Sequence, residues 1–309
     1  MTRLFFRLLL CLLPLAAVLP AQAQNAAAYV IADDHSGRIL EARNATKKLQ
    51  VGSLTKVATA MVVLDWCEAK GRDAGQLATV PLSAEALNNP NGVGFRAGDR
   101  CTLRDLLYAS LMQSDNAAAQ TLADFVGRGL GTDEEPVAAF VTQMNALARK
   151  LGMLRTRFVN AHGSDDTERT LPYSTAEDLA KLTQYAEARA GFRFYVSQKE
   201  KKISIQRESG EALAYMLRNT NELVGTASID GVKTGTTRRA GACVIVSAAR
   251  PPESRQDGDQ FFITPRRLNI VVLNAPDRFA AARMLLDRGW QVHESWVAAG
   301  RPEKWKAGK

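Results

Sequence analysis

The spacing of apolar residues changes character twice along the chain. Near the start, two short strand-like runs, 28–32 and 38–43, flank a link rich in turn-forming residues at 33–37. Such an arrangement predicts a β-hairpin. From Ser53 to Ala69 the apolar residues instead recur every three or four positions, which predicts an amphipathic helix.

The middle of the chain continues with the helical period, and the end returns to strands. Strands at both ends with helices between them predict an α+β fold, in which N- and C-terminal segments form one antiparallel sheet of mixed strand order. Helices flank this sheet, and a helical lobe is inserted between the two sets of strands. The polar stretch 250–260 is expected to be an exposed hairpin loop. The further helices are expected at 103–112, 116–126, 136–151, 175–188 and 277–287, and the strands near 203–205, 242–248 and 268–273.

The first segment, 1–23, has the features of a cleavable secretory signal. Arg3 and Arg7 flank an apolar run that ends in a small-residue triplet, and the run is shorter than the roughly 20 residues that span a bilayer. We therefore expect a secreted, periplasmic protein. The domain is expected to cover 24–290, followed by a basic tail, 291–309, with no second domain. Because Gly300 and Pro302 interrupt this tail, no strong membrane anchor is expected.

Charge and cysteine content narrow the classes of partner. The chain has 40 Lys and Arg against 32 Asp and Glu, a mild excess of positive charge, and an exported protein is not expected to bind nucleic acid. Cys67, Cys101 and Cys243 follow the signal, and an odd number cannot pair completely. The three histidines match no metal-ligand spacing. The prediction is therefore buried thiols, no metal and no cofactor.

The first candidate for chemistry is Ser53-Leu54-Thr55-Lys56 at the start of the predicted helix. A spacing of three places the hydroxyl and the amine on one helical face. An amine can accept the proton of a serine nucleophile only if its pKa lies well below the usual value near 10.4. Taken alone, the same pattern also fits a serine that caps the helix and a solvated lysine.

Two further motifs follow in order. Ser114-Asp115-Asn116 lies between two predicted helices, where a hydroxyl can relay a proton and an amide can bind a peptide group, although all three residues are also good helix caps. The segment 233–236, Lys-Thr-Gly-Thr, precedes an apolar strand. Its cation and hydroxyls suit a carboxylate, and its glycine lets another backbone approach closely. An ordinary solvated edge strand is the alternative.

The three motifs together resemble those of the low-molecular-weight penicillin-binding proteins, which are serine D,D-peptidases. The resemblance extends from about Tyr29 to Trp290 and implies the β-lactamase/transpeptidase-like fold. Flanking segments strengthen it, because they are similar to this peptidase family and not only to the wider superfamily. These segments are 37–40 with Asn44, 173–179, 219–223 and 230–235.

The resemblance implies catalytic roles for specific residues. Ser53 would be the acylated nucleophile and Lys56 its general base. Ser114 would relay a proton toward the leaving group. The backbone N–H groups of Ser53 and Thr236 would form an oxyanion hole.

It also implies how substrate would bind. Asn116 would hold the substrate amide, and Lys233 would supply positive potential. Thr234 and Thr236 would bind the terminal carboxylate, with Gly235 between them in the same strand.

The implied activity is that of a serine D,D-carboxypeptidase. It would remove the terminal D-Ala from peptidoglycan pentapeptide stems through an acyl-enzyme and its hydrolysis, with β-lactam antibiotics as acylating inhibitors. Cleavage of cross-linked stems by a D,D-endopeptidase uses the same chemistry, and the motifs do not choose between these substrates.

Departures from the family pattern keep two alternatives open. Asp115 stands where the family usually has Gly or Ala, as in a class A β-lactamase, but no Glu-x-x-Leu-Asn follows; Glu168 in a polar loop is a weak candidate for that glutamate. A catalytically silent wall-binding module is the other alternative, and the intact motifs weigh against it. Arg238 and Arg278 are both candidates for an arginine that assists carboxylate binding.

Overall fold

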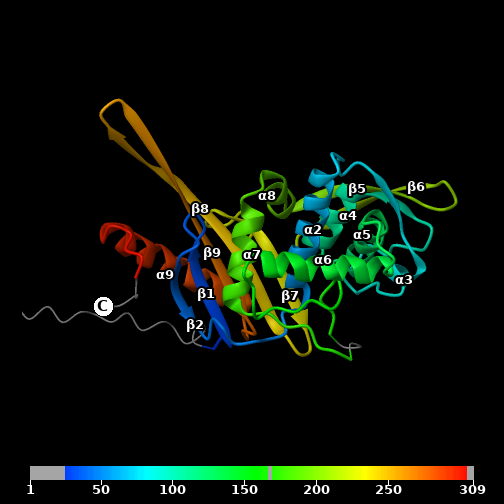
Figure 1. Cartoon of the computed structure of the whole chain (residues 1–309), viewed down its shortest axis with the longest axis horizontal. Coiled ribbons are helices and arrows are strands. Elements are labelled where there is room, and N and C mark those ends of the chain that lie inside the picture. Colours follow the sequence, from blue (N-terminus) through cyan, green and yellow to red (C-terminus); the bar gives the residue numbers. More distant parts are fainter. Residues whose placement is uncertain (1–24, 166–168, 305–309) are drawn as a thin grey trace, which may run out of the picture.

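The protein is described by a computed structural model that covers residues 25–165 and 169–304. Within these residues the centre of the fold is a five-stranded antiparallel sheet in the order β2-β1-β9-β8-β7 (Figure 1). The N-terminal hairpin therefore pairs with the last two strands, which confirms the predicted sheet. Its strands are β1 (Ala28–Asp33), β2 (Ile39–Arg43), β7 (Ile229–Thr237), β8 (Gly241–Asp257) and β9 (Gln260–Leu273).

Helices cover both faces of this sheet. Side chains along each strand alternate between the two faces, so they enter two different cores. Ile31 and Ile270 lie on one face and pack in a core with Leu285 of α9 (Arg278–Ala298). Val30 and Val271 point the other way and join the larger core of the helical lobe. Every residue of β1 is consequently buried, and all of its residues before Asp33 form an uninterrupted apolar run in the sequence.

The last helix, α9, is longer than the sequence pattern indicated. It begins after Asp277, whose carboxylate accepts hydrogen bonds from two backbone N–H groups of the first turn, and it continues to Ala298. Val292 and Trp296 are buried against the sheet. The expected end of this helix at residue 287 was therefore wrong, because the apolar face continues past residue 290, where the domain was expected to end.

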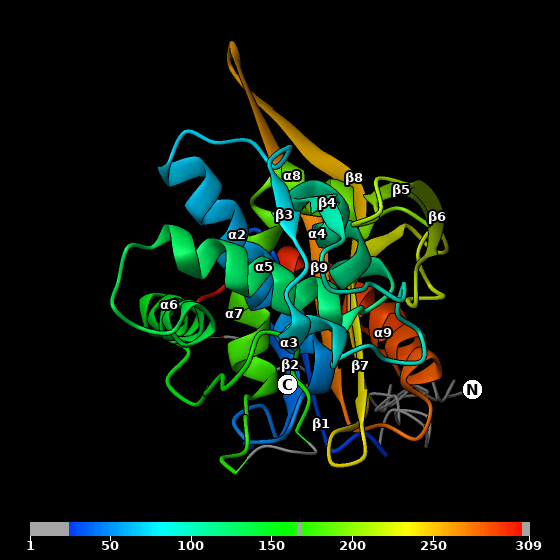
Figure 2. The ribbon, with the colours of Figure 1, turned by 90° about the vertical axis from the view of Figure 1, so that its right-hand side faces the viewer.

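The helical lobe covers the opposite face of the sheet (Figure 2). Its long helices correspond to the predicted ones within a few residues, because each buries an apolar face that repeats at helical spacing. α7 packs on β1 and β9 and so joins the lobe to the sheet. The helices are α2 (Lys56–Ala69), α3 (Leu82–Glu85), α4 (Leu103–Met112), α5 (Asn116–Gly129), α6 (Pro136–Lys150), α7 (Ala176–Glu187) and α8 (Ala190–Val196).

A second, four-stranded sheet belongs to the lobe. Its order is β3-β4-β5-β6. The strand pattern near 203–205 was expected to belong to the main sheet, but it forms part of β5 in this second sheet instead. Ile203 and Ile205 are buried there among residues of the lobe. The strands are β3 (Leu77–Thr79), β4 (Arg100–Thr102), β5 (Glu200–Gln206) and β6 (Ala212–Arg218).

β8 and β9 extend beyond the sheet as a two-stranded ribbon (Figure 1). Pairing continues from Glu253↔Thr264 to Asp257↔Gln260, so the expected hairpin loop at 250–260 is mostly strand. Near the end of the ribbon, Phe261 is 71% exposed and Ile263 is 69% exposed. The sequence did not reveal these strands because the ribbon buries no continuous apolar face.

Cys67, Cys101 and Cys243 are buried free thiols, as predicted. Burial is the main cause that raises the pKa of each, to about 11 for Cys243. The secretory signal predicted at 1–23 lies outside the described residues. Among the helices that the structure describes, none has the length and apolar character needed to cross a membrane.

Candidate active site

Ser53 lies in a 3₁₀ turn, η1 (Gly52–Thr55), that leads directly into α2. The α-helix thus begins at Lys56, slightly later than the pattern predicted. Gly52 has φ +54°, a conformation that favours glycine. A Cβ added there would stand 3.3 Å from the backbone nitrogen of Thr236. The turn therefore places Ser53 beside β7.

Lys56 is fully buried beneath Ser53. Its Nζ donates to Ser53 Oγ at 3.0 Å, to Asn116 Oδ1 at 2.7 Å and to the His162 carbonyl oxygen at 2.8 Å. These three acceptors use the three donors of an ammonium group. Burial lowers the pKa of Lys56 from 10.5 to about 7, although the charge of Asp115 opposes this shift. A neutral amine, able to accept the Ser53 proton, is thus accessible near neutral pH.

Ser114 occupies the short connection between α4 and α5. Its φ of +63° is unusual for a residue with a side chain. Such strain costs about 1–3 kcal/mol and is frequent at active sites. The conformation leaves Ser114 lining the same cleft as Ser53.

Asp115 has a structural explanation. One carboxylate oxygen accepts a hydrogen bond from Ala118 N at 2.7 Å and so caps α5, while the other accepts one from Val93 N at 2.6 Å. Asn116 N in turn donates to Asn89 Oδ1 at 3.0 Å. Burial raises the pKa of Asp115, and these backbone donors oppose that effect. Asp115, which departs from the family pattern, therefore links the start of α5 to the loop that contains Val93 and so fixes the position of the middle motif.

The third motif lies in β7, opposite Ser114. Lys233 is buried and donates to the Thr234 carbonyl oxygen at 2.9 Å. Burial, with the nearby charges of Lys56 and Arg278, holds the pKa of Lys233 well below 10.5. Gly235 matters for a different reason from the expected one: a Cβ added there would meet the Val51 carbonyl oxygen at 2.6 Å. The glycine lets β7 approach the turn that carries Ser53.

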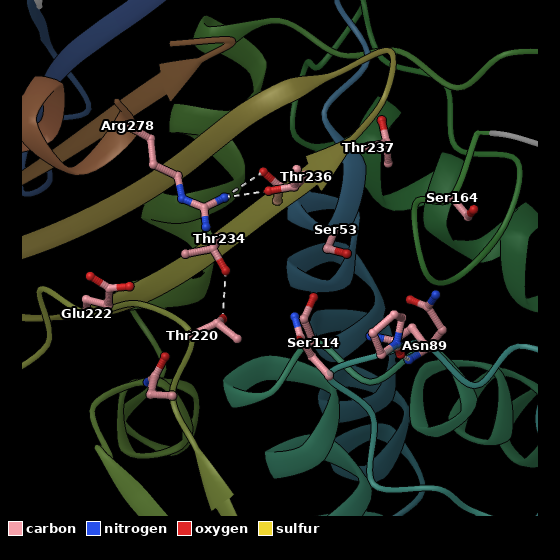
Figure 3. A pocket seen from close by; sticks show the side chains of 15 residues that line it. Ser53, Asn89, Ser114, Ser164, Thr220, Glu222, Thr234, Thr236, Thr237 and Arg278 are labelled. Carbon is pink, nitrogen blue, oxygen red and sulfur yellow. Dashed lines mark hydrogen bonds between the residues drawn. The ribbon is translucent and has the colours of Figure 1, made fainter. Parts of the chain in front are cut away.

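The motifs meet in one cleft of about 560 Å³ (Figure 3). Ser53 lies between Ser114 on one wall and Thr234 and Thr236 of β7 on the other. Lys56 and Lys233 lie buried behind these walls. All of the predicted site residues are thus brought together. The cleft is lined by Ser53, Asn89, Pro90, Asn91, Ser114, Asn116, Ser164, Asn219, Thr220, Glu222, Thr234, Gly235, Thr236, Thr237 and Arg278.

The two arginine candidates are clearly separated by their positions. Arg278, at the start of α9, lines the cleft and donates to Thr236 Oγ1 at 2.6 Å and to the Gly235 carbonyl oxygen at 3.1 Å. Arg238 is exposed and is not part of the cleft lining. The Arg278 guanidinium is therefore the one positioned to meet a carboxylate.

Some residues of the site had no individual signal in the sequence. Thr220 Oγ1 lies 2.7 Å from Thr234 Oγ1, and only the family-like segment 219–223 pointed to this region. The His162 carbonyl contact could not be found from residue type, because every residue has a carbonyl. Glu168, the candidate for a β-lactamase-like role, lies outside the described residues.

Comparison with known proteins identifies what the chain is similar to. Residues 16–256 match the family described as D-alanyl-D-alanine carboxypeptidase. The chain is 32% identical to D-alanyl-D-alanine carboxypeptidase DacC of Escherichia coli, over 89% of this chain and 64% of DacC. It is also 32% identical to a D-alanyl-D-alanine endopeptidase of Pseudomonas aeruginosa, over 85% of this chain and 76% of that protein. The chain thus spans less than two thirds of DacC.

Solved structures agree with this likeness. The crystal structure of the Streptomyces K15 DD-transpeptidase superimposes with a TM-score of 0.74 at 26% sequence identity. The match covers 86% of this chain and 97% of that one. The sheet and the helical lobe therefore follow the fold of a known DD-peptidase, as the sequence predicted.

Proposed function

The chain belongs to the D-alanyl-D-alanine carboxypeptidase family, and on this premise we propose that it is a serine D,D-carboxypeptidase acting on peptidoglycan pentapeptide stems. The observation that carries the proposal is the buried Lys56 amine, 3.0 Å from Ser53 Oγ and with its pKa lowered to about 7. A hydroxyl beside such a base is the arrangement that nucleophilic catalysis requires.

Acylation follows from these positions. Neutral Lys56 accepts the Ser53 proton while Ser53 Oγ attacks the carbonyl carbon between the two terminal D-Ala residues. The N–H groups of Ser53 and Thr236 stabilise the developing oxyanion, a contribution worth roughly 3–4 kcal/mol per donor. The C–N bond then breaks, the proton that Lys56 took from Ser53 is relayed through Ser114 to the leaving amine, and free D-Ala departs, so that Lys56 is neutral again.

Side chains of β7, of α9 and of the middle motif orient the substrate. Arg278 and the Thr234 and Thr236 hydroxyls bind the carboxylate of the terminal D-Ala, with Lys233 adding positive potential behind them. Asn116 Oδ1 is occupied by Lys56, so its Nδ2 is the end that donates to a carbonyl of the stem peptide.

Hydrolysis of the acyl-enzyme completes the cycle. A water molecule attacks the ester and returns the proton to Ser53 through Lys56. The third acceptor around Lys56 is the His162 backbone carbonyl, which cannot act as a general base. The similarity to D-alanyl-D-alanine carboxypeptidases and to an endopeptidase supports a peptidase that β-lactams inhibit over a β-lactamase.

We further propose that the protein works outside the cytoplasm, at the cell wall. Residues 1–23 have the sequence features of a secretory signal. The proposed substrates, peptidoglycan stem peptides, are also part of the cell wall. Peptidoglycan stems are then its partners, and β-lactam antibiotics its acylating inhibitors.

The test is the intact mass of the purified protein with excess benzylpenicillin, together with D-Ala release from a pentapeptide. We expect a long-lived adduct on Ser53 and release of D-Ala, both absent in Ser53→Ala, which retains the fold by circular dichroism. Rapid drug turnover with little adduct would identify a β-lactamase. Neither adduct nor turnover nor D-Ala release would leave a binding module.

A further inference from the structure

An apolar pocket lies in the helical lobe, away from the catalytic cleft. We call it the lobe pocket; it has a volume of about 410 Å³, within the range of ordinary ligand sites. It shares no lining residue with the cleft. Along α2, Lys56 begins the helix at the cleft and Lys70 follows its last turn at the lobe pocket, about 20 Å further on.

The lobe pocket lies between two helices, α2 and α6, which both belong to the helical lobe (Figure 1). The lining residues of each helix follow the helical spacing, so each helix turns one face toward the pocket. Ala69 of α2 and Ala146 of α6 have only a methyl side chain, so space remains between these faces. The two faces include Val62, Trp66 and Ala69 of α2 and Ala146, Leu147 and Lys150 of α6.

The floor of the lobe pocket is apolar and recessed. Val62 and Leu147 are each 7% exposed, and Trp66 is 6% exposed. The rings of Trp66 and Phe125 meet edge to face with their centroids 6.1 Å apart, and a Cβ added to Gly129 of α5 would stand 2.5 Å from the Trp66 ring. Because α5 thus holds this ring in position, the floor is preformed, which lowers the entropy cost of binding.

The charges around the lobe pocket favour an anion. Lys70 and Lys150 both line it, and neither forms an ion pair with any of the described carboxylates. Lys150 Nζ lies instead 5.7 Å from the centre of the Tyr185 ring. Asp65 also lines the pocket, but its carboxylate already accepts hydrogen bonds from Arg189 at 2.6 Å and from Tyr185 Oη at 2.7 Å. Two positive charges therefore lack a counter-charge at the pocket.

We propose that the lobe pocket binds a free amphiphile that has a single aliphatic chain and an anionic head group. The chain lies on Val62, Trp66 and Leu147, and the head group lies within reach of Lys70 and Lys150. A flat protein surface does not fit this site, because the apolar floor is recessed and none of the exposed large apolar side chains of the described residues line it. The site is separate from the proposed peptidase chemistry.

Isothermal titration calorimetry of the full-length protein with decanoate tests the proposal. We expect one decanoate to bind per chain. Octanoate should bind about fifteenfold more weakly, because it is two methylene groups shorter and each buried methylene strengthens binding about fourfold. Decyltrimethylammonium has a chain of the same length and the opposite charge, and its affinity should be about tenfold lower than that of decanoate because both lysines repel it.

Two kinds of variant locate the ligand. Ala146→Leu should lower the affinity for decanoate more than about tenfold, because Ala146 is half-buried and a leucine there fills the lobe pocket. Ala138→Leu is its matched control, since Ala138 is exposed on the same helix and outside the pocket. Lys70→Gln and Lys150→Gln should each lower the affinity up to about fivefold. Lys202→Gln, in β5, controls for net charge and should bind like wild type.

Thermal unfolding followed by circular dichroism shows whether each variant is folded. If folded Ala146→Leu bound decanoate as well as Ala138→Leu does, the ligand would lie elsewhere, for example beside Arg278 in the cleft, and the proposal would be wrong. Equal affinity for decanoate and decyltrimethylammonium would overturn it too, as would no binding of decanoate. The lysine variants and the chain-length comparison test the site even if Ala146→Leu does not fold. None of these results bears on the proposed peptidase function, which D-Ala release and the penicillin adduct test separately.

Discussion

Gly235 of β7 lies directly against Val51, which precedes the turn that carries Ser53. A Cβ added to Gly235 would stand 2.6 Å from the Val51 carbonyl oxygen and 3.1 Å from the Leu54 nitrogen. Both neighbours are backbone atoms, so neither can rotate away. The glycine therefore sets the separation between the nucleophile and the strand expected to bind substrate.

Gly235→Ala should consequently impair acylation more than stability. Pushing β7 from η1 separates the N–H groups of Ser53 and Thr236, and loss of one oxyanion donor costs about 100-fold or more in rate. Overpacking itself should lower the free energy of unfolding by about 1–3 kcal/mol. The measurements are the benzylpenicillin acylation rate and urea unfolding.

Gly191→Ala serves as the control for this substitution. Gly191 lies in α8 with no atom within 4 Å of an added Cβ. Alanine is favoured over glycine in a helix, so this variant should acylate normally and be no less stable. Normal acylation by Gly235→Ala would show that the close approach is not needed.

The sequence predicted the elements that bury an apolar face. The helices α4 and α7 and the hairpin of β1 and β2 were placed within a residue or two, because their periodicity reflects burial. The three-residue strands β3 and β4 are too short to show a period. The β8–β9 ribbon was missed because its pairing beyond residue 250 leaves residues such as Phe261 exposed.

The same distinction applies to the site. Ser53, Lys56 and Thr234 could be predicted because the three motifs occur in the order and spacing of a known peptidase family, whereas each motif alone also fitted a structural role. The sequence could not show that Arg278, and not Arg238, lines the cleft, because this depends on where α9 begins relative to β7. Nor could the bond between Asp115 and the Val93 backbone be foreseen, because its donor has no sequence signature.

The pH dependence of acylation should report the proton of Lys56. Its pKa is lowered to about 7, and only the neutral amine can accept the Ser53 proton. The second-order acylation rate should therefore rise about tenfold per unit at acidic pH and level off above about 7. Stopped-flow or mass measurements with benzylpenicillin from pH 5 to 9 give this profile. A rate still rising steeply at pH 9 would show that Lys56 titrates near its ordinary value.

Asp115→Ala should destabilise the protein. The substitution removes an N-cap, worth about 0.5–2 kcal/mol, and leaves the buried Val93 N–H without its acceptor, which costs about 1–3 kcal/mol more. Urea unfolding should therefore show a loss of a few kcal/mol. Asp124→Ala in the same helix breaks only the exposed pair with Arg128 and should cost less than about 1 kcal/mol. An equal decrease in the free energy of unfolding in both variants would show that the hydrogen bonds of Asp115 do not stabilise the connection to the Val93 loop.

Arg278 should recognise the terminal carboxylate of the substrate. Arg278→Gln removes the cation that lines the cleft, whereas Arg238→Gln removes an exposed charge outside it. A charge-assisted hydrogen bond is worth about 1.5–3 kcal/mol, so kcat/KM for a pentapeptide should fall about tenfold to a hundredfold in the first variant and stay near wild type in the second. A pentapeptide with a C-terminal amide lacks the carboxylate, and its slower cleavage should change little in either variant. If Arg278→Gln lowered cleavage of acid and amide equally, Arg278 would act by holding Thr236 and β7 in place and not by binding the carboxylate.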